Sequence, residues 1–368
     1  MHKIKSPELA GEIESIVAVL VDSIEKRIGL DDHRKGVEIN FSDLMAHFTT
    51  EVVYTCFYGQ KGRINFTGER SHHIVESEIG LQGLRSGVIM VSRLFPHLNP
   101  LIGLVGRKFH PSGRVRNTLI DFIQQQTKLN LEARQKRSSE GILNYKRSII
   151  DAFIDSFHEG KLTYDEYLNS SFFFYFAASK TTSDGLTLTA YFLAKHQDVQ
   201  DKLRQSIMKE GIESDYLGWC INESMRLQPP SLAGSARVLS KDIEHNGTTI
   251  PKGTLVMGPS YTIHRLREYW GNDANQFNPE RFADAKEFHP IQYMPFGVGK
   301  RSCPGKDLAY HEMKLTLVAL LSRYKLEMTD RTVDTILFTA PFNIMTIYED
   351  PIYLRLSRLE SSNPSGQR

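Results

Sequence analysis

The chain has 368 residues, of which 40% are hydrophobic, so it is long enough to bury a large core and a cofactor pocket. Its 45 Lys and Arg residues nearly balance 43 Asp and Glu residues, which gives no reason to expect a nucleic-acid partner. Cys56, Cys220 and Cys303 lie far apart and form no Cys-x-x-Cys pair, which disfavours a disulfide framework or a zinc site. No apolar run approaches the roughly 20 residues of a membrane-spanning helix, and the N-terminus has no apolar signal core. As written, the sequence predicts a soluble chain or one that has lost its beginning.

The first half of the sequence predicts helices. Apolar residues recur at three- and four-residue spacing over residues 7–27 and 41–57, so each segment should bury one face. Residues 63–111 carry glycine and proline turn signals and predict shorter helices and loops. Helical spacing returns over residues 117–137, 149–158 and 163–196. Thr163 followed by Glu166 forms a capping box at the start of the last of these segments.

The second half changes character after residue 230. Alternation at residues 236–239, a turn at 245–247 and an answering segment at 248–250 predict a small hairpin region. Residues 270–305 predict an ordered coil, residues 304–322 a helix and residues 352–356 a strand. The pattern predicts a mainly α fold with a small β portion. Because no repeat or Gly/Ser linker divides the chain, we expect a single domain over residues 1–360 and a disordered tail at 361–368.

Residues 296–305 predict an ionised cysteine sulfur. Cys303 comes directly before the predicted helix, which opens on a proline whose missing N–H costs nothing there. The helix N-terminus would point N–H groups and a positive dipole at the sulfur, so we expect a lowered thiol pKa, as a metal ligand requires. Gly299 and Gly305 would let the backbone approach a flat partner, and Arg301 could reach an anionic group on it. The alternative is a buried structural cysteine beside a helix cap.

The same ten residues resemble the heme-binding signature of the cytochrome P450 family, Phe-x-x-Gly-x-Arg-x-Cys-x-Gly, at every fixed position. The resemblance implies heme b as the cofactor and Cys303 as its axial iron ligand. It also implies that Phe296, Gly299, Arg301 and Gly305 help to bind the cofactor. In that family the thiolate pushes electron density onto the iron and favours cleavage of the O–O bond.

A second pair of motifs accompanies the signature. Glu223 and Arg226 lie three residues apart on one predicted helical face, which alone is typical of a surface ion pair. Here they resemble the family's Glu-x-x-Arg motif, and residues 278–282 resemble the Pro-Glu-Arg-Phe motif. The resemblance implies a buried network of Glu223, Arg226 and Arg281 that locks the coil beneath the heme. Removing one partner would leave a buried charge unpaired, at a cost of about 3–5 kcal/mol.

Two further site residues follow from the resemblance. Arg237 occupies the place of the family's heme-propionate arginine, and an ordinary edge-strand arginine is the alternative. The segment around Thr181 resembles the family's oxygen-binding helix, in which the threonine helps to deliver protons, so Thr181 is the catalytic candidate. The alternative is a Ser/Thr pair on the polar side of a core helix. Lys180 stands where the family has an acid, and an ammonium cannot accept a hydrogen bond as a carboxylate does.

The resemblance covers nearly the whole chain and implies a cytochrome P450-like fold that lacks its N-terminal part, in the style of the microsomal, drug- and steroid-oxidising branch. It implies a heme-thiolate monooxygenase that inserts one oxygen atom from O2 into an apolar small molecule, with electrons from NADPH-cytochrome P450 reductase. The expected product is a monomer on the cytosolic face of the endoplasmic reticulum, or in the cytosol, since no anchor is present.

Two alternatives remain open at this point. One is a heme-thiolate isomerase or dehydratase, which needs no proton relay and is therefore compatible with Lys180. The other is a catalytically inactive truncated fragment, because the start of the family's pattern has no counterpart in the sequence.

Overall fold

The computed structural model describes residues 7–30, 36–59, 148–231, 236–283, 288–336 and 350–359, and, in a further helical stretch, residues 121, 123–125, 127–133, 135–136 and 139. It divides into two compact units. Unit 1 takes its described residues from 26–41 and 184–368, and unit 2 takes them from 7–25 and 42–183. The expectations for residues 63–111 and 361–368 lie outside the described residues. The expectation of a single domain over residues 1–360 stays a prediction.

Unit 1 holds most of the strands and the helices of the second half of the chain. Its helices and short 3₁₀ turns are the last part of α8 (Tyr164–Lys195), α9 (Gln197–Glu210), η2 (Gly211–Glu213), α10 (Asp215–Leu227), α11 (Ser260–Ile263), α12 (Arg267–Trp270), η3 (Pro279–Phe282), η4 (Gly299–Arg301) and α13 (Lys306–Leu321). Its strands are β1 (Val37–Asn40), β2 (Ala236–Val238), β3 (Ile243–His245), β4 (Thr248–Ile250), β5 (Leu255–Met257), β6 (Tyr324–Met328) and β7 (Tyr353–Arg358).

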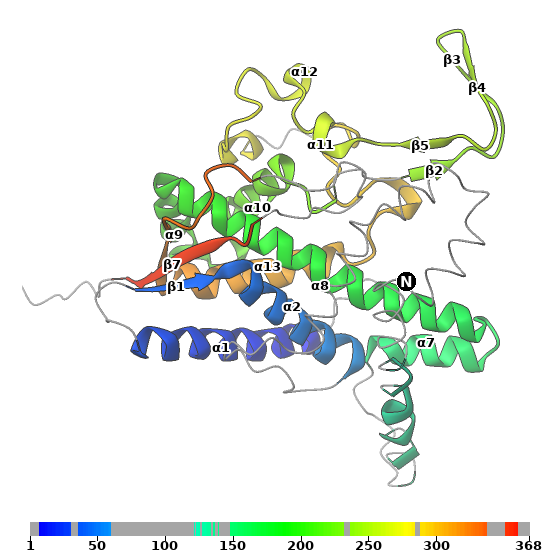
Figure 1. Ribbon diagram of the computed structural model, residues 1–368, viewed down its shortest axis with the longest axis horizontal. Coiled ribbons are helices and arrows are strands. Elements are labelled where there is room, and N and C mark those ends of the chain that lie inside the picture. The colour runs from blue at the N-terminus through cyan, green and yellow to red at the C-terminus, as the bar shows by residue number, and fades with distance from the viewer. Residues whose placement is uncertain are drawn as a thin grey trace, which may run out of the picture. The chain divides into compact units, whose positions relative to one another are not determined.

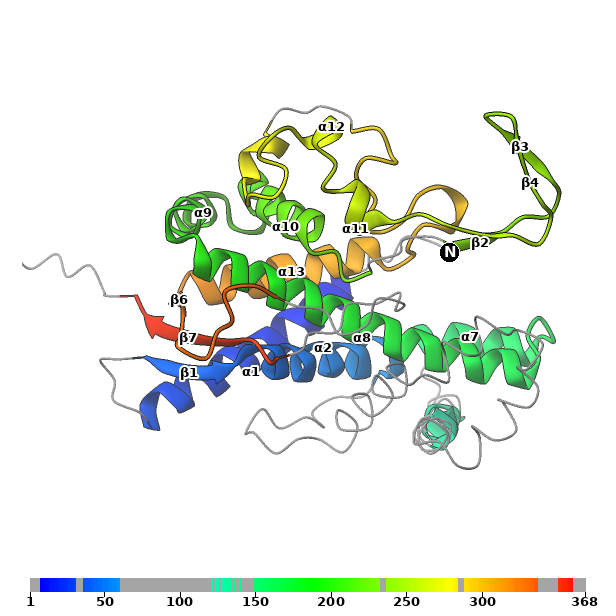
Figure 2. The ribbon, with the colours of Figure 1, turned by 45° about the horizontal axis from the view of Figure 1, so that its top comes forward.

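The strands of unit 1 form one three-stranded and two two-stranded sheets. In the larger sheet the order is β1-β7-β6 and both pairs are antiparallel. Leu354 pairs with Ile39, and Leu356 pairs with Leu326, so their buried side chains share one face. The predicted hairpin region exists with different pairing: β3 pairs with β4 across the turn, whereas β2 pairs with β5. The β3–β4 hairpin projects from the rest of unit 1 in Figure 1 and Figure 2.

Unit 2 is helical in its described residues. It contains most of α1 (Pro7–Leu30) and α2 (Phe41–Tyr58), the helical residues between 121 and 139, α7 (Ile149–His158) and the first part of α8. α7 runs alongside this part of α8 in both ribbon views (Figure 1, Figure 2). An aromatic-rich core joins α2, α7 and the first part of α8, and its buried members include Tyr54, Phe57, Ile150, Ile154 and Tyr175.

Most of the predicted helices are confirmed, and α8 shows why. Thr163 and Glu166 form the predicted capping box: the Glu166 N–H donates to Thr163 Oγ1 at 3.2 Å, and the Thr163 N–H donates to Glu166 Oε2 at 2.8 Å. These reciprocal bonds satisfy backbone donors that the first turn leaves without partners. Among the helices of the described residues, none combines the length and apolarity that crossing a membrane requires.

Candidate functional site

The loop that carries Cys303 is closed by its own backbone. The Cys303 N–H donates to the carbonyl oxygen of Phe296 at 2.8 Å, and the Ser302 N–H donates to Gly299 at 3.0 Å. Gly297 and Gly299 adopt φ values of 69° and 72°, which residues with a Cβ rarely tolerate. A Cβ on Gly299 would meet no other atom within 4 Å, so it is this backbone conformation that requires glycine there. The loop therefore fixes the backbone of Cys303.

Two sequence expectations about Cys303 are wrong in detail. The helix after it begins at Lys306, with Gly305 as its N-cap, and not at Pro304. The pKa of the Cys303 thiol is raised above its ordinary value, because partial burial disfavours the charged form more than the Gly305 N–H bond to sulfur favours it. Since α13 starts three residues beyond Cys303, the positive end of the helix dipole lies farther from the sulfur than expected.

The residues around Cys303 nevertheless fit a thiolate ligand. Cys303 is exposed, whereas Cys56 and Cys220 are buried. A Cβ added to Gly305 would lie 3.9 Å from the sulfur, at ordinary van der Waals distance, so Gly305 is next to the sulfur in space. Arg301 is also exposed, two residues away. A bound iron ion would deprotonate the thiol outright, so a raised pKa in the protein alone does not oppose ligation.

Glu223, Arg226 and Arg281 lie together in unit 1. Arg226 forms a bidentate pair with Glu223, from Nε to Oε2 at 2.6 Å and from Nη2 to Oε1 at 2.8 Å. Arg281 Nε donates to Glu223 Oε1 at 2.9 Å, and the Asn278 N–H donates to the same oxygen at 2.9 Å. Arg281 also pairs with Asp273 at 3.0 Å. Both Glu223 and Arg226 have no exposed surface, so α10 is joined to the Asn278–Phe282 segment inside the core.

Arg226 also fixes the coil that follows β5. Its Nη1 donates to the carbonyl oxygens of His264 at 2.6 Å and Ala274 at 2.7 Å, and its Nη2 donates to Gln276 at 3.3 Å. The guanidinium lies over the Trp270 ring at 4.9 Å from its centroid. One side chain of α10 therefore holds three carbonyl groups of an otherwise irregular segment.

A chain of contacts leads from this network to the cysteine loop. The Met294 N–H donates to His264 Nε2 at 2.9 Å, and the Gly297 N–H donates to the Met294 carbonyl oxygen at 3.0 Å. His264 Nε2 must be unprotonated to accept this bond. From the sequence, His264 and Arg265 match a pair that is frequent in the family, with no catalytic role assigned, and nothing in the sequence reveals that the His264 ring is fully buried.

Asn222 is a second residue that the sequence analysis missed. Its backbone carbonyl oxygen accepts from the Tyr293 hydroxyl at 3.0 Å, and its side-chain oxygen accepts from the Tyr310 hydroxyl at 2.5 Å. Tyr310 belongs to α13 and lies 5.3 Å from the Phe296 ring, centroid to centroid. Asn222 thus links α10 to both flanks of the cysteine loop. It is adjacent to Glu223 in sequence, which is the signal that could have drawn attention to it.

Arg237 and Thr181 take no part in these contacts. Arg237 is exposed on β2 and donates through Nη1 to the carbonyl oxygen of Ala236 at 2.7 Å. Thr181 belongs to unit 2, whereas the other predicted site residues belong to unit 1. The Thr181 hydroxyl donates to the carbonyl oxygen of Ala177, one turn earlier in α8, at 2.7 Å.

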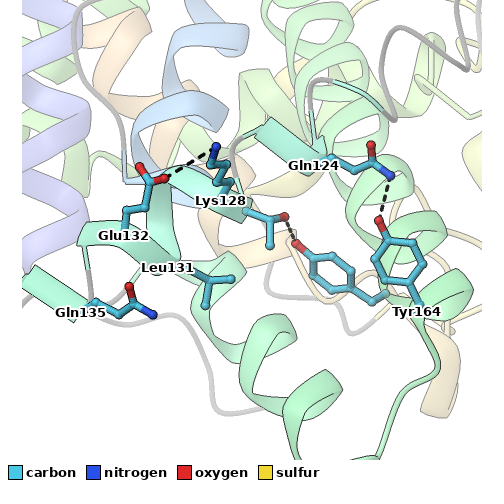
Figure 3. Close-up of a pocket in the computed structure, with 8 residues that line it drawn as sticks. Gln124, Lys128, Leu131, Glu132, Gln135 and Tyr164 are labelled. Carbon is cyan, nitrogen blue, oxygen red and sulfur yellow. Dashed lines mark hydrogen bonds and ion pairs between the residues drawn. The ribbon is translucent and has the colours of Figure 1, made fainter.

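One hollow in the described residues of unit 2 is lined by none of the predicted site residues. It has a volume of about 290 Å³ and lies between the helical residues 121–139 and the start of α8 (Figure 3). Gln124 Nε2 donates to the Tyr164 hydroxyl at 2.7 Å, and the hydroxyls of Thr127 and Tyr167 share a hydrogen bond. The two charged residues of its lining, Lys128 and Glu132, are both largely exposed. The full lining consists of Gln124, Thr127, Lys128, Leu131, Glu132, Gln135, Tyr164 and Tyr167.

A model of the cytochrome P450 family matches residues 2–354. The chain is 29% identical to cytochrome P450 3A12 of Canis lupus familiaris, over 94% of this chain and 69% of the relative. It is 30% identical to cytochrome P450 3A5 of Homo sapiens, over 79% of this chain and 59% of the relative. Against cytochrome P450 3A15 of Cavia porcellus it is 33% identical, over 65% of this chain and 49% of the relative.

The chain belongs to the cytochrome P450 family. The predicted mainly α fold with a small β portion is confirmed, and the cofactor of this family is heme b. The matched region spans about half to about two thirds of the length of these relatives. The family is in general one of heme monooxygenases.

Proposed function

We propose that this chain binds heme b through Cys303 and inserts one oxygen atom from O2 into an apolar small molecule of the steroid, fatty-acid or xenobiotic class. The observation that carries the proposal is the exposed residue Cys303 on a loop closed by the Phe296–Cys303 backbone bond. Membership of the family supports the same activity. When bound, the heme supplies the binding and activation of oxygen.

Each site residue has a role under this proposal. Arg301 and Arg237 are exposed cations that can pair with the heme propionates, and Gly299 and Gly305 keep bulk away from the porphyrin face. Phe296, packed against Tyr310, holds the loop to α13. Thr181 would turn its hydroxyl from the Ala177 carbonyl to move a proton toward the reacting oxygen. The Glu223 network positions the loop and does not touch the reacting atoms.

The redox partner and location follow the same proposal. We assign electron supply to NADPH-cytochrome P450 reductase, and the site of action to the cytosolic face of the endoplasmic reticulum with a monomeric chain. Both assignments draw on resemblance to the microsomal branch of the family. They are tested by activity that depends on added reductase and by fractionation of cells that express the chain.

The ligand is tested by spectroscopy. The chain is expressed with heme supplied, reduced and exposed to carbon monoxide, and the strongly shifted Soret band of a thiolate-ligated heme is expected. Cys303→Ser should abolish that band, whereas Ser302→Ala, a change at the exposed neighbouring residue, should retain it. A band that survives Cys303→Ser would mean that another residue binds the iron, and a chain that takes up no heme would support the inactive fragment.

A second arm tests the reaction. With NADPH and the reductase, an apolar substrate should yield an oxygenated product that contains one atom from labelled O2. Rearrangement of a peroxide substrate in the absence of reductant, with no product from O2, would contradict the monooxygenase and support the isomerase.

A further inference from the structure

A small polar cavity lies between α2 and α8 in unit 2. Its volume is about 20 Å³, and five of its lining residues are polar: Thr49, Thr50, Ser179, Lys180 and Ser183. Ala46 and Phe176 close the remainder. The cavity adjoins the residue at which this chain departs from its family, since Lys180 stands in place of an acid and directly precedes Thr181.

The two serines that line the cavity differ from Thr181 and Thr189 of the same helix. Thr181 and Thr189 each donate to the carbonyl oxygen four residues earlier, at 2.7 Å. The hydroxyls of Ser179 and Ser183 have no hydrogen-bond partner within the described residues, although only 8% and 3% of the two residues' surfaces are exposed. They are four residues apart and therefore lie on one face of the helix, the face that lines the cavity.

Buried hydroxyls without a partner are rare, because losing water without a replacement hydrogen bond costs free energy. The opposite wall offers acceptors. Thr50 and Thr49 donate to the Ala46 carbonyl oxygen at 2.7 Å and 3.3 Å, so their oxygens keep lone pairs for another donor. The Lys180 ammonium has only donors. The lining therefore combines donors from α8 with acceptors from α2.

We infer that this cavity binds one ordered water molecule that bridges α2 and α8. A volume of about 20 Å³ exceeds the roughly 10–15 Å³ that a single water needs, and a water requires two to four polar partners. The water accepts from the serine hydroxyls or Lys180 and donates to Thr49 or Thr50. It thereby satisfies the hydroxyls of Ser179 and Ser183. The inference does not depend on heme and stands apart from the proposed function.

The test counts long-lived waters in solution. Oxygen-17 relaxation dispersion of the full chain should show one fewer slowly exchanging water in the double variant Ser179→Ala, Ser183→Ala than in the wild type. Ser183→Thr, which adds a methyl group to the cavity wall, should remove the same water while retaining a hydroxyl. The matched control is Thr189→Val, which deletes a buried hydroxyl of α8 that already has a protein partner and should leave the count unchanged.

A crystal structure at a resolution that shows ordered solvent supplies the second measurement. One water peak within hydrogen-bond distance of Ser179 or Ser183 and of a residue of α2 supports the inference. An empty cavity, a chloride ion identified by its anomalous signal, or an unchanged water count in the double serine variant overturns it.

Discussion

The Glu223 carboxylate carries an unusual number of contacts for one side chain. Its Oε1 accepts from Arg226, Arg281 and the Asn278 N–H, and its Oε2 accepts from Arg226. Two guanidinium groups thus converge on one carboxylate, and Asp273 offsets the second. In a fully buried setting a neutral replacement at position 223 leaves positive charge without compensation, and desolvation makes that state costly.

Glu223→Gln should therefore lower the free energy of unfolding by about 3–5 kcal/mol, measured by urea denaturation. Arg226→Lys should also destabilise the chain, because a lysine cannot reproduce the bidentate pair. The matched control is Glu38→Gln in unit 1, since Glu38 pairs with Arg331 at 3.3 Å where both side chains are partly exposed, and the expected loss there is at most about 1 kcal/mol. Equal small losses in both variants would contradict the structural role of the network.

His264 should make stability depend on pH. Burial, together with the nearby charges of Arg226 and Arg265, lowers the pKa of His264 from 6.5 to about 4. As the pH falls below 6.5 the unfolded chain takes up this proton and the folded chain does not, so the stabilisation is complete above 6.5 and is lost toward 4. Protonation would also remove the acceptor for the Met294 N–H.

Between pH 7.5 and pH 5 the free energy of unfolding should fall by about 2 kcal/mol more in the wild type than in His264→Gln, which has no proton to gain. Urea denaturation at the two pH values measures this difference. The same experiment with His196→Gln, a histidine of unit 1 whose ring contacts Phe277, serves as the control for the substitution itself. A parallel fall in wild type and His264→Gln would show that other groups govern the acid sensitivity.

At the scale of elements, the predictions succeeded where a signal was local. Helices α2, α7 and α8 follow from apolar spacing, and the α8 N-terminus follows from Thr163 and Glu166. The partner of β2 was wrong because strand pairing is a long-range property, and the turn at residues 245–247 indicates only that β3 meets β4. The α13 start was misplaced because a proline fits a turn as well as a first helical position.

The capping box gives a prediction for α8. Thr163→Ala removes both the acceptor for the Glu166 N–H and the hydroxyl that contacts the Glu166 carboxylate, so it should lower the free energy of unfolding by about 1 kcal/mol. Thermal denaturation measures the change. Ser156→Ala, which deletes a hydroxyl bonded within α7 and not at a cap, should have little effect. A loss equal to that of Thr163→Ala would mean that the cap contributes nothing specific.

The candidate site was predictable to the extent that its residues lie in short motifs. Positions 223, 226 and 281 are brought together by contacts that the motifs imply, whereas His264 and Asn222 act through backbone groups of distant segments. Backbone partners of this kind depend on how coils are folded, and a single sequence carries no local pattern for them. The raised thiol pKa of Cys303 was unforeseen for a related reason, since it depends on burial by neighbours in space.

At the scale of the whole molecule, the single-domain expectation can be tested by comparing two signals. Trp219 and Trp270, the two tryptophans of the sequence, both lie in unit 1, so fluorescence follows that unit, whereas far-ultraviolet circular dichroism follows helices of both units. Because α8 contributes residues to each unit, we expect the two urea transitions to coincide. Separate midpoints would contradict a single domain over residues 1–360.

The burial of Cys56 and Cys220 leaves Cys303 as the accessible sulfur among the three of the sequence. A thiol reagent should therefore modify one group rapidly in heme-free protein, faster at alkaline pH because the pKa of that thiol is raised. Once the sulfur is bound to the iron, the same reagent should modify no thiol rapidly. Unchanged labelling would mean that a different residue binds the iron. The rate of thiol labelling therefore reports the fraction of the chain that has bound heme, without a measurement of heme absorbance.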